Sequence, residues 1–359
     1  MRLPLMLAVS AVVGVAAIGA ATTLKSPTVT NNWPMRRDHD RPGPDSARVA
    51  QLFASLQATD PVICELIADQ VGNFWNADHR GIGRFAGAQT NLQPVKDSIS
   101  GRVTQPRAID LLVKNLNAQN TCVRRLASKM LGNSAVDARG LSSLLASSDA
   151  TVRESAAYAA GHRDSLDVRG ALESALDDRT PAVVAMAAWA LGEGEDARAI
   201  PALVRAARHT DAHVRATAVW ALGRLNEHEQ DAQTSVLPAL ESALTDRNIE
   251  VQRVAADAFS SIEELHVAPT ALVKALASSD VELKYYAARA LADIADPATT
   301  KDLVTLIGSP DRELRKSAVE ALGKIGGAEA IAGLTRALND KDREVRKAAV
   351  EALGDAKER

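Results

Sequence analysis

The feature that most constrains the fold is an eleven-residue segment that recurs along most of the chain. Segments such as CVRRLASKMLG, HVRATAVWALG and EVRKAAVEALG share one apolar pattern and close with a small residue. The closing residues are Gly132, Gly161, Gly192, Gly223, Ser260, Ala292, Gly323 and Gly354. They follow one another at intervals of 29 to 37 residues. A period of this length is typical of a solenoid, in which each repeat buries its apolar face against the next.

Each repeat is predicted to contain two helices. Counted from the first apolar residue of the recurring segment, positions one, five, eight and nine are apolar, which is a helical stripe. An Asp often precedes this second helix and a Gly closes it, which are cap residues at the expected ends. The first helix is shorter, and its Pro residues are expected in the first turn. The sequence therefore predicts an all-α solenoid of about eight to nine two-helix repeats, wound as a right-handed superhelix.

The repeats carry a recurring Asp and Arg that identify a family resemblance. Asp149-x-x-Val152-Arg153 is the first of these motifs, and each ends in an Ala-Leu-Gly or a close variant. The same spacing occurs at Asp211 to Arg215, Asp311 to Arg315 and Asp342 to Arg346. The chain resembles the HEAT family in its short Ala-rich form, which phycobilin lyases also contain, strongly over residues 105–359 and weakly over 45–75. The resemblance implies the solenoid fold but no single role. Because Asp precedes Arg by four, we expect the pair to clamp the first turn of the second helix rather than to bind a ligand.

The chain before the array of repeats, which begins near residue 105, is predicted to direct export. Arg2 is followed by an uncharged run, residues 3–24, that fits either a cleaved signal peptide or an uncleaved membrane anchor. Residues 25–45 are predicted to form a flexible tether, 46–75 a degenerate first repeat, and 76–104 a Gly-rich inserted loop. The expected location is therefore periplasmic or secreted, with membrane attachment only through residues 3–24.

The predicted export bears on whether the two cysteines form a disulfide. Cys64 and Cys122 are an even pair, and an oxidising compartment favours a disulfide between them. Two separate buried thiols are the alternative. The two are too far apart in sequence for a CxxC zinc or redox motif.

Composition and motif searches favour a binding protein over an enzyme. A net charge of −3 does not fit a nucleic-acid-binding protein, which is usually strongly basic. The chain contains no GxSxG, HExxH or Walker-type motif, and no cofactor or metal is expected. His209 and His213 straddle a turn between helices, where polar residues are common. The alternative is an enzyme accessory, a sensor of the kind found with membrane metallopeptidases, or a lyase-like or metal-binding solenoid that uses Asp78 and His79.

The predicted binding surface is a stripe of positions three and seven on successive second helices. Lys316 with Glu320, and Lys347 with Glu351, place charged i,i+4 pairs at these positions, so both positions should face solvent. Three consecutive repeats have an aromatic residue at position seven instead, although aromatic residues are only 3% of the chain. An exposed aromatic patch is typical of an interaction site. The predicted partner is a protein or peptide, and the predicted contacts are Tyr158, Trp189, Trp220, Glu154, Asp257, Tyr285 and Arg289.

Overall fold

The computed structural model describes residues 43–57, 101–163, 167–226, 233–262 and 265–358. These residues form seventeen α-helices and no strand, with three short 3-10 segments. All of them belong to one compact unit, Asp38–Arg359. The predicted all-α solenoid is confirmed. The predicted signal segment and most of the predicted tether and inserted loop lie outside the described residues.

The helices form eight consecutive pairs, preceded by a single helix, α1 (Ser46–Gln57). The first helices of the pairs are α3 (Pro106–Lys114), α5 (Ala138–Leu145), α7 (Arg169–Ala175), α9 (Ile200–Ala206), α11 (Gln233–Ala243), α13 (Thr270–Ala275), α15 (Thr300–Leu306) and α17 (Gly327–Ala337). The second helices are α4 (Thr121–Gly132), α6 (Ala150–Gly161), α8 (Pro181–Glu193), α10 (Ala212–Asn226), α12 (Ile249–Ala258), α14 (Val281–Ile294), α16 (Arg312–Ile325) and α18 (Arg343–Glu358). As predicted, the second helix is the longer one in most pairs.

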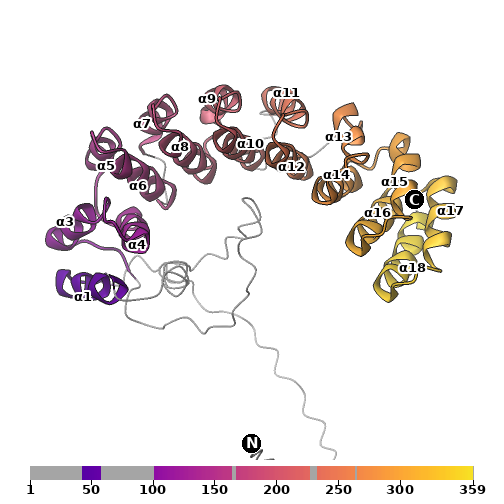
Figure 1. The fold of residues 1–359 in the computed structure, drawn as a ribbon, viewed down its shortest axis with the longest axis horizontal. Coiled ribbons are helices and arrows are strands. Elements are labelled where there is room, and N and C mark those ends of the chain that lie inside the picture. Colours follow the sequence, from indigo (N-terminus) through magenta and orange to yellow (C-terminus); the bar gives the residue numbers. More distant parts are fainter. Residues whose placement is uncertain (1–42, 58–100, 164–166, 227–232, 263–264, 359) are drawn as a thin grey trace, which may run out of the picture. The chain divides into compact units, whose positions relative to one another are not determined.

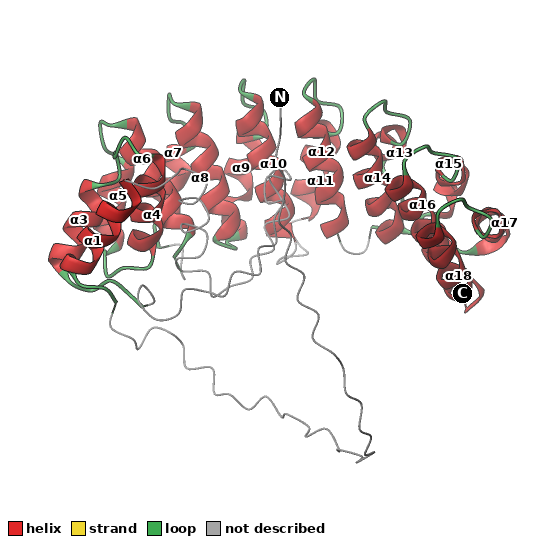
Figure 2. Cartoon of the chain, turned by 60° about the horizontal axis from the view of Figure 1, so that its bottom comes forward, coloured by secondary structure: helices red, strands yellow, loops and turns green. Residues whose placement is uncertain are grey.

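The pairs stack in sequence order. Each second helix packs against the second helix of the next repeat, and against the first helix of its own repeat. Figure 1 shows the result as two rows, one of first helices and one of second helices. Figure 2 shows the turns between helices gathered at the two edges of these rows. Side chains at the same position of successive second helices are therefore neighbours across the repeat junction.

The predicted N-caps of the second helices are confirmed. Asp149 accepts a hydrogen bond from the backbone N–H of Thr151 at 2.8 Å, and Asp311 accepts one from Leu314 at 2.8 Å. Asn120 and Asn248 take the same place in α4 and α12. Each cap satisfies a backbone donor that has no partner inside its own helix.

The closing glycines have a different role from the predicted one. Gly192, Gly223 and Gly323 lie inside their helices, and the described glycines with positive φ are Gly101, Gly326 and Gly327. A Cβ on Gly323 would lie 2.6 Å from the Cβ of Ala352 in the next repeat, and one on Gly223 would lie 2.8 Å from that of Ala258. The prediction that these glycines act as C-caps was wrong. They let the next second helix approach closely at its position-eight alanine.

Two further segments differ from the sequence-based expectation. Pro238 lies inside α11 rather than in its first turn, because the helix begins at Gln233, two residues earlier than the apolar pattern indicated. Residues 101–104, the last part of the predicted inserted loop, are attached to the array. There the N–H of Val103 donates to the carbonyl of Asn133 at 3.1 Å, and the Val103 side chain is buried.

Candidate functional site

Two of the predicted stripe residues form a ring stack at the junction between α6 and α8. The rings of Tyr158 and Trp189 have centroids 5.2 Å apart and an interplanar angle of 24°. His162 meets both rings edge-on, with centroids 4.5 Å from Tyr158 and 5.3 Å from Trp189. Arg125, from α4, places its guanidinium carbon 5.9 Å from the centre of the Tyr158 ring. Residues of three consecutive second helices thus converge on one half-buried aromatic cluster.

The tryptophans also pack on the closing glycines of the preceding repeats. The Cζ3 atom of Trp189 would lie 2.4 Å from a Cβ on Gly161, and that of Trp220 would lie 3.0 Å from one on Gly192. The two rings therefore occupy equivalent places in adjacent repeats, each partly buried by the helix before it. Part of each ring has a packing role, and the remainder is accessible.

Position seven is accessible along the whole array, as predicted. The residues there are half-buried or exposed in all eight pairs: Lys129, Tyr158, Trp189, Trp220, Asp257, Arg289, Glu320 and Glu351. Position three follows the prediction less closely, because Ala185 is buried whereas Glu154 and Ala216 are half-buried. The expectation that both tryptophans have open faces was wrong for Trp189, because Tyr158 covers one face of its ring.

Three further predicted residues form a second group at the junction between α12 and α14. Arg289 pairs with Asp257, which occupies position seven of the preceding repeat. Its guanidinium carbon also lies 5.7 Å from the centre of the Tyr286 ring, and Tyr285 meets Tyr286 edge-on. Five of the seven predicted contacts therefore belong to one of two groups, an aromatic cluster with Tyr158 and Trp189 and a mixed polar group around Arg289. Trp220 packs separately at Gly192, and Glu154 lies half-buried on α6.

The sequence-based prediction missed Arg125 and His162. His162 lies four residues after Tyr158, so helical spacing puts the two on one face. Arg125 occupies position three of the repeat before Tyr158. Both could have been found by following the stripe one turn beyond its aromatic positions.

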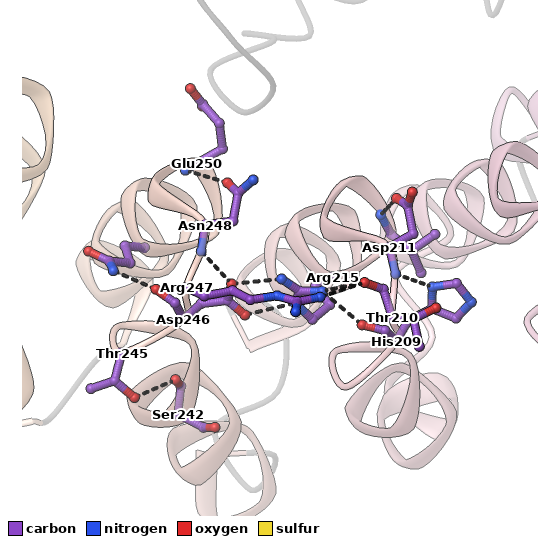
Figure 3. Close-up of polar contacts among 12 residues, drawn as sticks. His209, Thr210, Asp211, Arg215, Ser242, Thr245, Asp246, Arg247, Asn248 and Glu250 are labelled. Atoms are coloured by element: carbon purple, nitrogen blue, oxygen red, sulfur yellow. Dashed lines mark hydrogen bonds and ion pairs between the residues drawn. The ribbon is translucent and has the colours of Figure 1, made fainter.

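The recurring arginine has a structural role, but not with the predicted partner. Arg215 of α10 donates Nε and Nη2 to the carboxylate of Asp246, each at 2.7 Å, and Asp246 lies in the turn of the next repeat. Its Nη1 donates to the carbonyls of His209 and Thr210 in its own repeat, both at 2.9 Å (Figure 3). Arg153 with Asp178, and Arg315 with Asp340, repeat this arrangement. The predicted clamp between Asp and Arg four residues apart was wrong, because the arginine joins one repeat to the next.

These ion pairs are largely shielded from water. The side chains of Arg315 and Asp340 are 4% and 7% exposed. The bidentate hydrogen bond from its arginine lowers the pKa of Asp178, Asp246 and Asp340 below the usual aspartate value, against the opposing effect of burial. The same bonds raise the pKa of the arginines, so both partners stay charged at neutral pH.

The other residues considered as ligands contribute little to a site. His209 accepts a hydrogen bond from the N–H of Asp211 at 3.0 Å, and His213 is exposed. Within the described ranges no three His, Cys, Asp or Glu side chains are grouped as metal ligands. Asp78 and His79 lie outside the described residues. Cys122 is disulfide-bonded, but Cys64 also lies outside the described residues, so the pairing of the two stays a prediction.

Comparison with known families agrees with this repeat architecture. A family model described as HEAT repeats matches residues 138–214, 171–260, 206–282 and 269–354. The chain belongs to the HEAT-repeat family. Solenoids of this family commonly mediate protein interactions and are typically non-catalytic, so the protein has the fold of an interaction scaffold.

The chain is also similar to three solved structures. The Escherichia coli protein YibA is 19% identical, with a TM-score of 0.55 over 68% of this chain and 92% of YibA. One engineered protein is 26% identical, with a TM-score of 0.49 over 86% of this chain and 88% of its own. Another is 29% identical, with a TM-score of 0.43 over 54% of this chain and 97% of its own. A search of curated proteins found no match.

Among the described residues, no helix has the length and apolar composition needed to cross a bilayer.

Proposed function

We propose that this HEAT-repeat protein is a non-catalytic scaffold outside the cytoplasm. It binds a protein or peptide at the aromatic stripe, which consists of Tyr158, Trp189 and Trp220 at position seven. The supporting observation is the accessible position-seven row, in which Tyr158, Trp189 and Trp220 replace the charged residues of later repeats. Trp and Tyr are enriched among residues that dominate binding energy, because each buries a large area at little cost in conformational entropy.

The geometry of the cluster supports recognition of an extended or helical segment. The half-buried Trp189 ring stacks on Tyr158 and packs close to Gly161, both on α6, and these contacts restrict its orientation. A rigid aromatic edge loses little freedom on binding, which favours affinity. Glu154, four residues before Tyr158 on α6, adds a negative charge that would orient a partner with a polar rim, whereas Arg289 is already paired with Asp257.

The binding role is tested by substituting the aromatic residues. The Trp189→Ala/Trp220→Ala variant is expected to lose capture of the partner from the exported fraction while keeping the helical circular dichroism of the parent. The matched control is Ile249→Ala/Val267→Ala, which removes two exposed apolar side chains away from the stripe. A variant that lacks both tryptophans, folds normally and still captures the same protein as the parent and the control would exclude the aromatic site.

The proposed location has a separate test. Residues 3–24 would direct export, and cleavage near Gly19 to Ala21 would release the mature chain. Fractionation of cells followed by mass measurement of the mature N-terminus distinguishes a cleaved signal from an anchor. Recovery of the full-length chain in the cytoplasm would contradict export without bearing on the aromatic stripe.

A further inference from the structure

The first helices α11 and α13 are separated by a groove with a volume of about 840 Å³. Its walls come from α11, from α13 and from the residues just before α13, and its floor includes Leu283 of α14. A volume between about 300 and 1,000 Å³ is typical of sites that hold small ligands. No residue of the aromatic stripe lines the groove, and α11 and α13 belong to the other row of helices in Figure 1. The groove is therefore a separate candidate site.

The groove lies at a repeat junction that lacks the usual ion pair. At the preceding junction Arg215, at position two, binds Asp246, which lies two residues before the first residue of α12's cap and turn, as Figure 3 shows. The residues at these two places of the α12–α14 junction are Gln252 and Ser278, and both line the groove. Gln252 keeps the contact within its own repeat, because its Nε2 donates to the carbonyl of Asp246 as Nη1 of Arg215 donates to that of His209. The uncharged side chains are shorter, so space is left where the preceding junction holds a guanidinium and a carboxylate.

This combination of side chains distinguishes the α12–α14 junction from the other six junctions between described pairs. The residues at the same two places of those junctions are Arg124 with Ser147, Arg153 with Asp178, Val184 with His209, Arg215 with Asp246, Lys284 with Ser309, and Arg315 with Asp340. Five of them have a long cationic side chain at position two, and the sixth has a valine. The α12–α14 junction instead has an amide and a hydroxyl, which bear no charge and can bond to a ligand.

The two walls of the groove carry opposite charges. Glu241 on α11 and Lys274 on α13 both line the groove and are exposed. Neither side chain forms an ion pair with a described residue, so the carboxylate and the ammonium group are available to a ligand. The apolar part of the lining includes Leu244 and Leu283, which are 5% and 2% exposed. The groove thus presents one positive group, one negative group, hydrogen-bonding side chains and an apolar floor.

The length of the groove limits the size of a ligand. The helix α13 has 6 residues and is therefore about 9 Å long. An extended peptide rises about 3.3 Å per residue, so about three residues cover this length. A ligand with one kind of charge would bind one wall and leave the charge of the other wall without a partner. A tripeptide with free termini carries both charges on a chain of the right length.

We propose that this groove is a second binding site, for a short peptide with free termini. The peptide ammonium group contacts Glu241, and the terminal carboxylate contacts Lys274. An apolar side chain of the peptide packs on Leu283, and the amide of Gln252 and the hydroxyl of Ser278 bond to the peptide backbone. The site is independent of the aromatic stripe and of the partner proposed for it.

The test is a nuclear magnetic resonance titration of the full chain, isotope-labelled at the Leu and Val methyl groups, with the tripeptide Ala-Leu-Ala. The methyl signals of Leu244 and Leu283 are expected to shift with saturation. The same peptide with an acetylated N-terminus and an amidated C-terminus is expected to bind about tenfold more weakly, because it lacks both charges. The absence of a saturable shift would overturn the proposal. Equal binding of the free and blocked peptides would also overturn it, and would assign the groove to a segment inside a longer chain.

Each charged contact is tested by combining a variant with a half-blocked peptide. Lys274→Met is expected to weaken binding of the free peptide about threefold and to leave binding of the amidated peptide unchanged. Glu241→Gln is expected to do the same for the free and the acetylated peptide. Variants that weaken every peptide equally would contradict contacts with the two termini.

The vacant ion-pair position allows the groove to be filled. Gln252→Arg/Ser278→Asp introduces the residue types of the preceding junction at two positions that line the groove. Peptide binding is expected to be lost, while the helical circular dichroism matches that of the parent and the melting temperature is equal or higher. The matched control is Lys284→Arg/Ser309→Asp, which introduces the same residue types at the next junction, where neither residue lines the groove. The control is expected to bind the peptide as the parent does.

Binding that survives in the folded Gln252→Arg/Ser278→Asp variant would overturn the proposal. Shifts confined to the indole signals of Trp189 and Trp220 would also overturn it, and would assign the peptide to the aromatic stripe. Loss of stripe binding in the Trp189→Ala/Trp220→Ala variant, with the Leu244 and Leu283 shifts retained, is the expected result for two independent sites.

Discussion

At the scale of single residues, the array depends on a fit between small side chains of adjacent repeats. Position ten of one second helix is usually Gly, and position eight of the next is Ala in all seven pairs that follow the first. A methyl group at Gly192, Gly223 or Gly323 would lie less than 3 Å from the next second helix, so there is no room for one. The Ala-rich composition is thus a packing requirement, because closely spaced helices bury small side chains.

Gly161 provides the sharpest test of this packing. Gly161→Ala would place its Cβ 2.4 Å from the Trp189 ring, so the free energy of unfolding is expected to fall by about 1–3 kcal/mol. The ring must also move, which should shift the tryptophan fluorescence. Urea unfolding and emission spectra measure the two effects.

Gly354 is the matched control for that substitution. It lies in α18, and a Cβ there meets nothing within 4 Å. Gly354→Ala is therefore expected to raise the free energy of unfolding by up to about 1 kcal/mol through helix propensity. Equal effects of the two substitutions would show that close packing does not explain the recurring glycine.

At the scale of helices, the ends are determined by caps that differ between the two termini. Most second helices begin with an Asp or Asn side-chain cap, of which the sequence predicted the Asp caps, whereas α8 begins after Thr180 without one. At the C-termini the recurring glycines do not act as caps: α16 ends on a later glycine, Gly326, and α14 ends on Ala295, with φ of 52°. A non-glycine residue in this region is strained because its Cβ approaches the following carbonyl.

That strain predicts a stabilising Ala to Gly substitution. Ala295→Gly is expected to raise the free energy of unfolding by roughly 0.5–1 kcal/mol, because glycine adopts the left-handed region freely. The control is Ala332→Gly, at an exposed position inside α17, which should lower it by about 1 kcal/mol. Thermal unfolding of both variants is expected to show opposite changes in stability, a gain in Ala295→Gly and a loss in Ala332→Gly. A loss of stability in Ala295→Gly would contradict the strain at this cap.

The sequence predicted the elements better than the contacts between them. Helical spacing and Asp caps identify the two helices of each repeat, because both are local signals within one segment. The partner of Arg153 could not be read in this way, since Asp178 lies 25 residues away and competes with the nearer Asp149. The stack of Tyr158 and Trp189 likewise depends on the room that Gly161 leaves for the Trp189 ring from the next repeat.

At the scale of the whole molecule, repeat junctions carry a series of similar ion pairs. In a solenoid each repeat contacts only its neighbours, so the stability of the array is approximately the sum of repeat and junction terms. The pairs from Arg153, Arg215, Arg253 and Arg315 each join one repeat to the next. α8 has Val184 at the position of Arg153, and its junction relies on Trp220 and Ala221 packing on Gly192.

Arg315 and Arg346 allow one junction to be compared with its unpaired equivalent. Arg315→Ala leaves Asp340 largely buried without its counterion, and the free energy of unfolding is expected to fall by about 3 kcal/mol. Arg346→Ala removes the same side chain where no described carboxylate is bound, and a loss of about 1 kcal/mol or less is expected. Urea titrations followed by circular dichroism compare the two. Similar losses would mean that the ion pair contributes little to the junction.

The same pairs determine how the array responds to acid. A carboxyl group whose pKa is lowered in the folded state stabilises the fold above its unfolded pKa of about 3.9, and that contribution is lost as the pH falls toward the folded value. Asp178, Asp246 and Asp340 all have lowered pKa values, so the free energy of unfolding should hold steady down to about pH 5 and then decline. Asp340→Asn is expected to be less stable than the parent at pH 7 and to lose less on going from pH 5 to pH 3. Urea unfolding at pH 7, 5 and 3 measures how the free energy of unfolding of each protein changes with pH. The same pH dependence in parent and variant would show that Asp340 titrates alike in the folded and unfolded chain. It would also show that Arg315 does not hold the Asp340 carboxylate at the junction.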